Sequence, residues 1–229
     1  MISILWFLAL VAIVAALLVR ALARREPGED RAASVRWTAR GLGIVALWLV
    51  PSGLAAARGA LAFTGRPPTF FVLLGLTTLA TTLLAFSPVG TRLITRVGIA
   101  GLVGFQAFRL PLELLLHRLH GEGVVPVQMT FAGSNFDIVT GILALVLGAW
   151  TLAARPPRVA ILGFNLIGLA LLVTIVTIAI LSMPTPLRRF HDGPANAFVA
   201  QWPFVWLPAF LVQAAWFGHL LVFRRLARR

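Results

Sequence analysis

Long apolar stretches alternate with short polar segments along the whole chain. There are seven such stretches, and a helix that crosses the hydrocarbon core of a bilayer needs about 20 mainly apolar residues. The pattern therefore predicts an all-α polytopic transmembrane bundle in which residues 1–229 form a single domain. We expect its seven helices at residues 2–19, 38–63, 69–86, 94–118, 137–154, 159–182 and 203–223.

Composition agrees with this architecture and narrows the possible chemistry. The chain is 59% hydrophobic and only 12% charged, which is more apolar surface than a soluble domain of 229 residues can bury. Cysteine is absent, which excludes disulfides, thiolate chemistry and cysteine-ligated metal clusters.

The arginines predict the orientation, because loops rich in basic residues stay on the cytoplasmic side of a membrane. One alternate set of polar segments holds Arg20, Arg24, Arg25, Arg31, Arg36, Arg40, Arg92, Arg96, Arg155, Arg158, Arg224, Arg225, Arg228 and Arg229. The other set holds Arg58, Arg66, Arg118, Arg188 and Arg189. We therefore expect the N-terminus outside and the C-terminus in the cytoplasm. Arginines follow the first stretch and do not precede it, unlike those of a secretory signal peptide, so this stretch is expected to remain as a helix.

The net charge of +13 does not indicate a nucleic-acid partner, because the basic residues lie at helix ends and not on one soluble face. We expect residues 20–37, the main cytoplasmic loop, to contact anionic lipid headgroups. Every basic residue is an arginine, and Ala, Leu, Val and Gly are abundant. This composition favours a bacterial source and thus an inner membrane.

The fourth predicted helix carries a polar stripe. At about 100° per residue, five polar side chains fall within an arc of about 80°. They are Gln106, Arg109, Glu113, His117 and His120. Ionisable groups that face lipid are costly, so the stripe should face other helices or a wet cavity. Arg109 and Glu113 are spaced to pair one turn apart, and such a pair either locks helix packing or belongs to a binding site.

Two outer segments complete the candidate pocket. Residues 124–136 are too apolar for a free loop and too short to span, so we expect them to cover the bundle, with Asn135 or Asp137 capping the next helix. The second segment, residues 183–202, is also polar in its middle. The candidate pocket residues are Gln106, Arg109, Glu113, His117, His120, Asn135, Asp137, Arg188, His191 and Asp192.

No cofactor is expected, although two alternatives stay open. His117, His120 and His191 are weak candidates for zinc or iron, because their spacing matches no established motif. Haem would need facing axial histidines, and His219 lies far from the outer histidines. His219 is instead placed to form a hydrogen bond with Asn165 across the last two helices.

Several short motifs resemble those of a family of uncharacterised bacterial multi-pass membrane proteins. They are residues 108–113 (FRLPLE), 129–141 (MTFAGSNFDIVTG), 184–186 (PTP), 194–196 (PAN) and 206–208 (WLP). Ala132 and Ser134 depart from the acidic and basic residues expected there. The resemblance covers roughly residues 70–225. It implies no activity, and it directs attention to the outer ends of the fourth, fifth and seventh helices.

Two classes of function fit these observations. The first is a non-catalytic sensor, small transporter or accessory subunit with a water-filled pocket open to the periplasm. Such a pocket would be lined by Gln106, Arg109, Glu113, His117 and Asp137, and would take a small polar or anionic ligand, or a protein partner. The alternative is a membrane-embedded enzyme, possibly metal-dependent, that uses the outer histidines and carboxylates.

Overall fold

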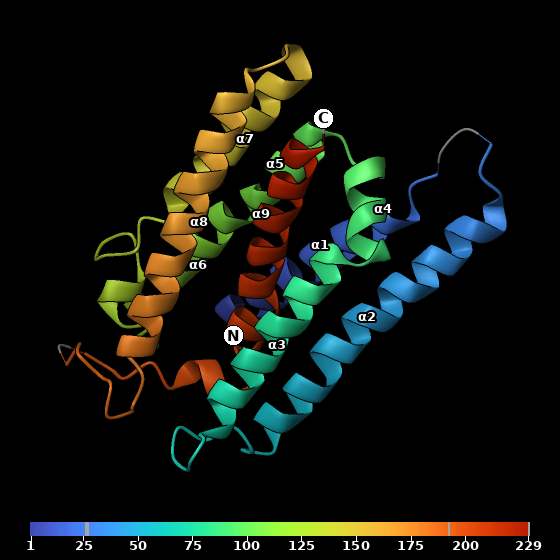
Figure 1. Cartoon of the computed structure of the whole chain (residues 1–229). Helices are drawn as coiled ribbons and strands as arrows, with labels where there is room; N and C mark the ends of the chain where they lie inside the picture. Colours follow the sequence, from blue (N-terminus) through green and yellow to red (C-terminus); the bar gives the residue numbers. More distant parts are fainter. Residues whose placement is uncertain (26–27, 192, 229) are drawn as a thin grey trace.

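A computed structural model describes residues 1–25, 28–191 and 193–228, and the described chain is helical with no β-strand (Figure 1). The α-helices are α1 (Ile2–Ala23), α2 (Arg31–Ala57), α3 (Thr69–Phe86), α4 (Pro88–Arg96), α5 (Ile99–Gly104), α6 (Arg109–Gly121), α7 (Ile138–Ala153), α8 (Arg158–Leu181) and α9 (Val212–Ala227). Short turns of 3-10 helix are η1 (Phe105–Phe108), η2 (Val127–Met129) and η3 (Phe198–Ala200), and η4 (Leu207–Leu211) is a π-helical turn.

Six helical segments are long and apolar enough to cross a membrane, which identifies a multi-pass membrane protein. They are Ile2–Ala23, Arg31–Ala57, Thr69–Phe86, Ile99–Gly121, Arg158–Leu181 and Leu207–Ala227. The seventh apolar stretch also forms a helix, α7, but with 16 residues it is shorter than these six.

The second helix begins and ends earlier than predicted. It starts at Arg31 and not at residue 38, because the basic segment before the apolar stretch continues the same helix. It ends at Ala57 and not at residue 63. Gly59, with φ of 65°, lies in the left-handed region that commonly follows a helix end.

The prediction of one helix over residues 94–118 was wrong at its start. The chain forms a separate helix, α4, whose first turn has Ser87 as its cap and Pro88 at the first helical position. The hydroxyl of Ser87 accepts a hydrogen bond from the Val89 amide at 3.1 Å. A new helix then begins at Ile99 and continues through η1 to Gly121. Hydropathy alone does not separate the end of α4 from the start of α5, because apolar residues continue from one helix into the next.

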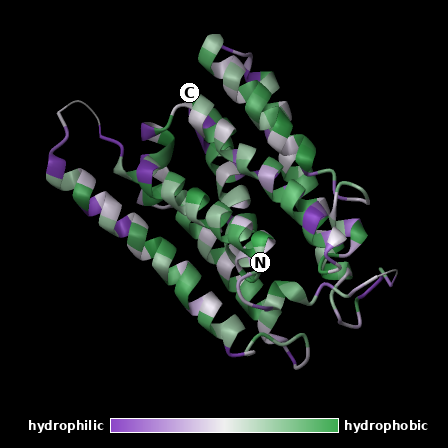
Figure 2. Cartoon of the chain, turned by 180° about the vertical axis from the view of Figure 1, so that it is seen from behind, coloured by the Kyte–Doolittle hydropathy of each residue, from purple (hydrophilic) through white to green (hydrophobic). Residues whose placement is uncertain are grey.

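The last helix, α9, occupies the centre of the bundle. It packs against α3, α4, α5 and α8 (Figure 1), and its span is the most buried of the six. Helices α2 and α3 lie toward the outside, and their outward side chains include Leu47, Leu76 and Leu83, each more than 60% exposed. Most of the helical ribbon in Figure 2 carries the colours of hydrophobic residues, as expected for helices that cross a membrane.

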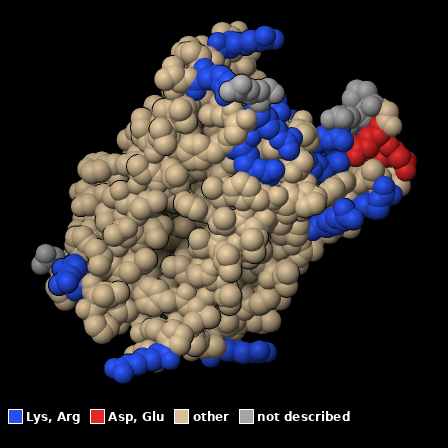
Figure 3. All heavy atoms as spheres, in the orientation of Figure 1, with Lys and Arg blue, Asp and Glu red and all other residues tan. Residues whose placement is uncertain are grey.

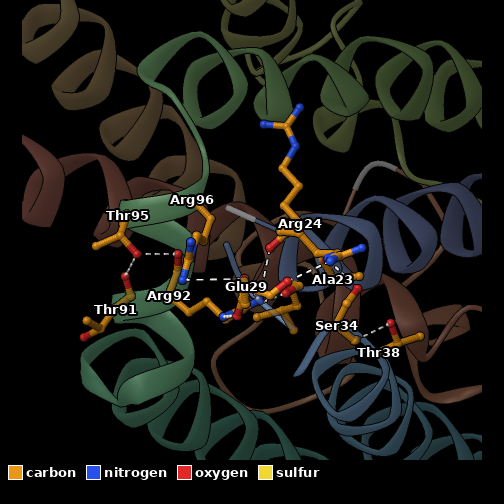
Figure 4. A network of polar contacts seen from close by, with 11 residues as sticks. Ala23, Arg24, Glu29, Ser34, Thr38, Thr91, Arg92, Thr95 and Arg96 are labelled. Carbon is orange, nitrogen blue, oxygen red and sulfur yellow. Dashed lines mark hydrogen bonds and ion pairs between the residues drawn. The ribbon is translucent and has the colours of Figure 1, made fainter. Parts of the chain in front are cut away.

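The two ends of the bundle differ in charge. We call the end that holds residues 24–25, 28–30, 87–98, 154–157 and the described end of α9 the arginine-rich end (Figure 3). Glu29 lies within this end, 2.8 Å from Nη1 of Arg92 and 3.6 Å from Nη2 of Arg96 (Figure 4). Arg92 also donates to the carbonyl oxygens of Leu22 and Arg24. These bonds attach the connection between α1 and α2 to α4. Glu26 and Pro27 of that connection lie outside the described residues.

Candidate functional site

A buried ion pair joins α6 to the start of α7. Nε of Arg109 lies 2.5 Å from Oδ2 of Asp137, and Nη2 contacts the other carboxylate oxygen, so the pair is bidentate. Both side chains are at most 5% exposed. The expected pairing of Arg109 with Glu113 was wrong, since no ion pair joins these two in the described structure. The spacing of residues along one helix could not show that Asp137, in the segment before α7, is the partner of Arg109.

The other side of the Arg109 guanidinium faces α8 and α9. Its Nη1 donates to the carbonyl oxygen of Gly168 at 3.2 Å and lies 3.0 Å from Nε2 of His219. Four of the five guanidinium N–H groups thus have partners: one on Nε, one on Nη2 and two on Nη1. Arg109 therefore connects four segments of the bundle and has little capacity left for a ligand.

His219 continues this network to Asn165, as predicted. Its Nδ1 lies 2.8 Å from Oδ1 of Asn165, and Nδ2 of Asn165 donates to the His219 carbonyl oxygen at 3.1 Å. Because Arg109 can only donate, Nε2 of His219 accepts, and the proton of the neutral ring lies on Nδ1. The chain Asp137–Arg109–His219–Asn165 is thus satisfied at every step.

Glycines let the helices that carry this network approach closely. A β-carbon at Gly141 of α7 would lie 2.5 Å from the backbone nitrogen of Leu110 on α6. A β-carbon at Gly168 of α8 would lie 2.6 Å from the His219 ring. Since real contacts of this kind are longer, neither position accepts a side chain without movement of its neighbour.

Glu113, one turn after Arg109, is held by a different partner. Nδ2 of Asn135 donates to Oε2 of Glu113 at 2.6 Å and to the carbonyl oxygen of Met129 at 3.0 Å. Oδ1 of Asn135 accepts from the Asp137 amide at 3.0 Å. Asp137 occupies the position before α7, but its carboxylate binds Arg109 and the Thr140 hydroxyl, so the predicted side-chain cap is not formed.

The segment 124–136 folds against the bundle, as predicted. Val125, Met129 and Thr130 are at most 2% exposed. A β-carbon at Gly133 would lie 2.4 Å from the carbonyl oxygen of Val127, so this segment also packs tightly on itself. Its burial explains how Asn135 is positioned beside Glu113.

A mainly apolar cavity of about 70 Å³ borders the ion pair. Arg109, Glu113, Asp137 and Asn196 form its polar wall, and the remaining lining residues are apolar side chains of α3, α6, α8 and α9, with a few from the connecting segments. This cavity differs from the one expected from sequence, because neither Gln106 nor His117 lines it. Gln106 instead donates to the carbonyl oxygen of Ala215 on α9 at 2.9 Å.

The other predicted pocket residues do not join this cluster. His117 is exposed and stacks on Phe131, with ring centroids 4.4 Å apart, and Nδ1 of His120 lies 2.9 Å from the Val125 carbonyl oxygen. Arg188 donates to the carbonyl oxygens of Phe190 and Gly193. His191 is exposed, and Asp192 lies outside the described residues. Within the described ranges, no three His, Asp or Glu side chains are close enough to hold a metal ion.

The N-terminus meets the end of α6 at the surface. The Ser3 hydroxyl donates to Oε1 of Glu122 at 2.5 Å, and Nε of Arg118 lies 3.2 Å from the same oxygen. The Ser3 hydrogen bond, together with Arg118, lowers the pKa of the Glu122 carboxyl. This contact places Met1 at the end of the bundle opposite the arginine-rich end.

Sequence reasoning missed Asn196 as a site residue. It is fully buried, its amide nitrogen donates to the Ala179 carbonyl oxygen at 2.9 Å, and it lines the cavity. Its place in the motif at residues 194–196 was the only signal in the sequence.

Comparisons with known proteins identify no relative. No family model matches the chain, and neither a curated protein nor a solved structure shows significant similarity to it.

Proposed function

We propose that this chain is a seven-span protein of a bacterial inner membrane, with its N-terminus in the periplasm. Six segments have the length and apolarity of spans, and α7 supplies the seventh. Nη2 of Arg158 contacts the Leu226 carbonyl oxygen, so the turn after α7 lies beside the end of α9. The segment before α7 lies at the opposite end, where Met1 is also found. This arrangement supports a seventh crossing, and the arginine distribution supports a cytoplasmic C-terminus.

We further propose that the protein binds a small ligand without transforming it, as a sensor, small transporter or accessory subunit. The observation that carries this proposal is the cavity beside Glu113, Asp137 and Asn196. A cavity with convergent polar groups on an apolar wall is the usual form of a ligand site. Met129 and Met183 also line it, and both belong to the outer connecting segments, which supports a site that opens toward the periplasm.

Binding fits the geometry better than catalysis does. Arg109, Asp137 and His219 hold one another through hydrogen bonds and ion pairs, which leaves them few free positions for proton transfer. None of the three histidines of the enzyme alternative, His117, His120 and His191, lines the cavity. The ion pair therefore acts as a rigid wall for a bound molecule.

A cavity-filling variant tests this function. Val176 lines the cavity, and Val176→Trp should fill it without changing any charged group. We would purify both proteins in native lipid discs and compare the small molecules extracted from each. Enrichment of a compound with the wild type over Val176→Trp is expected, while identical extracts would overturn the binding function.

A further inference from the structure

The cavity beside the ion pair is one part of a longer groove. A second cavity, of about 200 Å³, shares Leu74, Leu172, Val176 and Val212 with the first. Both volumes exceed the roughly 15 Å³ that one water molecule needs. The groove runs between α3 and α8, and residues of α9 form its floor. Figure 3 shows a hollow near the centre of this face of the molecule.

The groove borders the lipid. Val173 of α8 lines the second cavity and is 52% exposed on the outer surface of the bundle. The other walls are mainly apolar side chains, and Trp216 lines the second cavity. Thr78 and Thr177 also line the second cavity, where their hydroxyls donate to the carbonyl oxygens of Leu74 and Val173. A molecule dissolved in the bilayer could therefore enter sideways, without passing through water.

Two buried amide oxygens of the groove have no hydrogen-bond partner among the described residues. The Asn196 side chain belongs to the lining of the first cavity and the Gln213 side chain to that of the second, and the unpartnered atoms are Oδ1 of Asn196 and Oε1 of Gln213. The orientation of each amide is fixed, because the nitrogen of Asn196 donates to the Ala179 carbonyl oxygen and that of Gln213 to the Pro208 carbonyl oxygen. Both free atoms are acceptors, and a buried acceptor without a donor is unfavourable.

Glu113 lies on the same wall and is held there by Asn135. Of its two carboxylate oxygens, only Oε2 accepts a hydrogen bond from a described residue, Asn135. Among the described residues that line the first cavity, Oδ1 of Asn196 is the buried acceptor without a partner, while the Arg109 guanidinium is largely engaged by Asp137 and His219. The complementary guest has an apolar body and a head that donates hydrogen bonds.

We propose that this groove binds a bilayer-dissolved molecule with a long apolar body and a hydroxyl head, whose O–H donates to Oδ1 of Asn196. The proposal rests on the ligand-binding function and names its chemical class. It replaces the polar or anionic guest expected from sequence, because the walls are apolar and the free polar atoms are acceptors.

The test uses photoreactive hexadecanol, with a diazirine in its chain, and the matched methyl ether, which lacks the donor. The full-length protein in phosphatidylcholine vesicles is labelled with each probe, and the labelled peptides are identified by mass spectrometry. The alcohol should label α3, α8 and residues 196–199 about fivefold more than the ether, which is the effect of one hydrogen bond. This comparison requires no variant to fold.

Three variants locate the site. Asn196→Leu should reduce alcohol labelling to the level of the ether, and Val176→Trp should abolish labelling of the groove by both probes. Val146→Trp, at a lipid-exposed position of α7, is the control and should leave both unchanged. Equal labelling by the alcohol and the ether would overturn the proposal that the ligand has a hydroxyl head. If Val176→Trp still reduced that labelling, the groove would remain a ligand site. Labelling of the groove that is unchanged by Val176→Trp would overturn both the ligand-binding function and the proposed class of ligand.

Discussion

Nη1 of Arg109 on α6 lies 3.0 Å from Nε2 of His219 on α9, and this contact joins the ion pair to the centre of the bundle. An arginine can only donate, so the histidine must present a lone pair to it. Oδ1 of Asn165 accepts a hydrogen bond from the opposite ring nitrogen, Nδ1 of His219. One cation on α6 thereby fixes the tautomer of a histidine on another helix.

The His219 tautomer can be measured directly. We expect a neutral ring with its proton on Nδ1, because Nε2 accepts from Arg109. The chain has 4 histidines, so ¹⁵N-histidine spectra of the wild type and a His219→Gln variant would assign the signal. A proton on Nε2 of His219 would contradict the network.

Breaking the Arg109–Asp137 pair should destabilise the fold. Asp137→Asn leaves a buried guanidinium without its carboxylate, which costs about 3–5 kcal/mol. Arg109→Gln in the same chain should restore part of the loss, because neither charge then remains unpaired. Folded yield and thermal unfolding in detergent measure both effects.

The matched control is the surface pair of Arg118 and Glu122, whose side chains are 47% and 41% exposed. Arg118→Gln should leave the unfolding temperature unchanged, since exposed ion pairs contribute little. Losses that simply add in the Arg109–Asp137 double variant would argue against direct coupling.

Hydropathy predicted the membrane helices because the signal is local. About 20 apolar residues in succession suffice to identify a span. The stripe also correctly indicated that Gln106, Arg109 and Glu113 turn inward, since all three are at most 1% exposed. Helix α4 was not predicted, because its last residues run directly into the next apolar stretch along the sequence.

The site itself depended on contacts that one helix cannot reveal. The partners of Arg109 come from the start of α7, from α8 and from α9, brought together where Gly141 and Gly168 permit close approach. His117 lies one turn after Glu113 yet is exposed, because near the end of α6 the buried face of the helix is formed by Leu115, Leu116 and Leu119. The groove could not be predicted, since it lies between helices that are distant in sequence.

Gly141 should be intolerant of even one added carbon. A β-carbon there would lie 2.5 Å from the backbone of Leu110, so Gly141→Ala must separate α6 from α7. Gly75 is the control, because a β-carbon at that position of α3 meets nothing within 4 Å. Gly75→Ala should be neutral or stabilise by about 0.5–1 kcal/mol through helix propensity. An equal unfolding temperature for both variants would refute the close contact.

The covering segment can be probed with single cysteines, because the chain has none of its own. Val125 and Met129 are buried, whereas Gly121 is exposed. Cysteines at the first two positions should react slowly with a membrane-impermeant maleimide, and one at Gly121 should react rapidly. Uniform rapid labelling would show that the segment does not stay on the bundle.

The seventh crossing determines whether the two termini lie on the same side. A helix of 16 residues is about 24 Å long, shorter than the ~30 Å hydrocarbon core, so α7 is the span that most needs a test. We expect a C-terminal alkaline phosphatase fusion to be inactive and an N-terminal epitope to be accessible from the periplasm. The arginines at both ends of the turn after α7, Arg155 and Arg158, favour its cytoplasmic position. An active C-terminal phosphatase together with an accessible N-terminal epitope would mean an even number of crossings, with α7 failing to span.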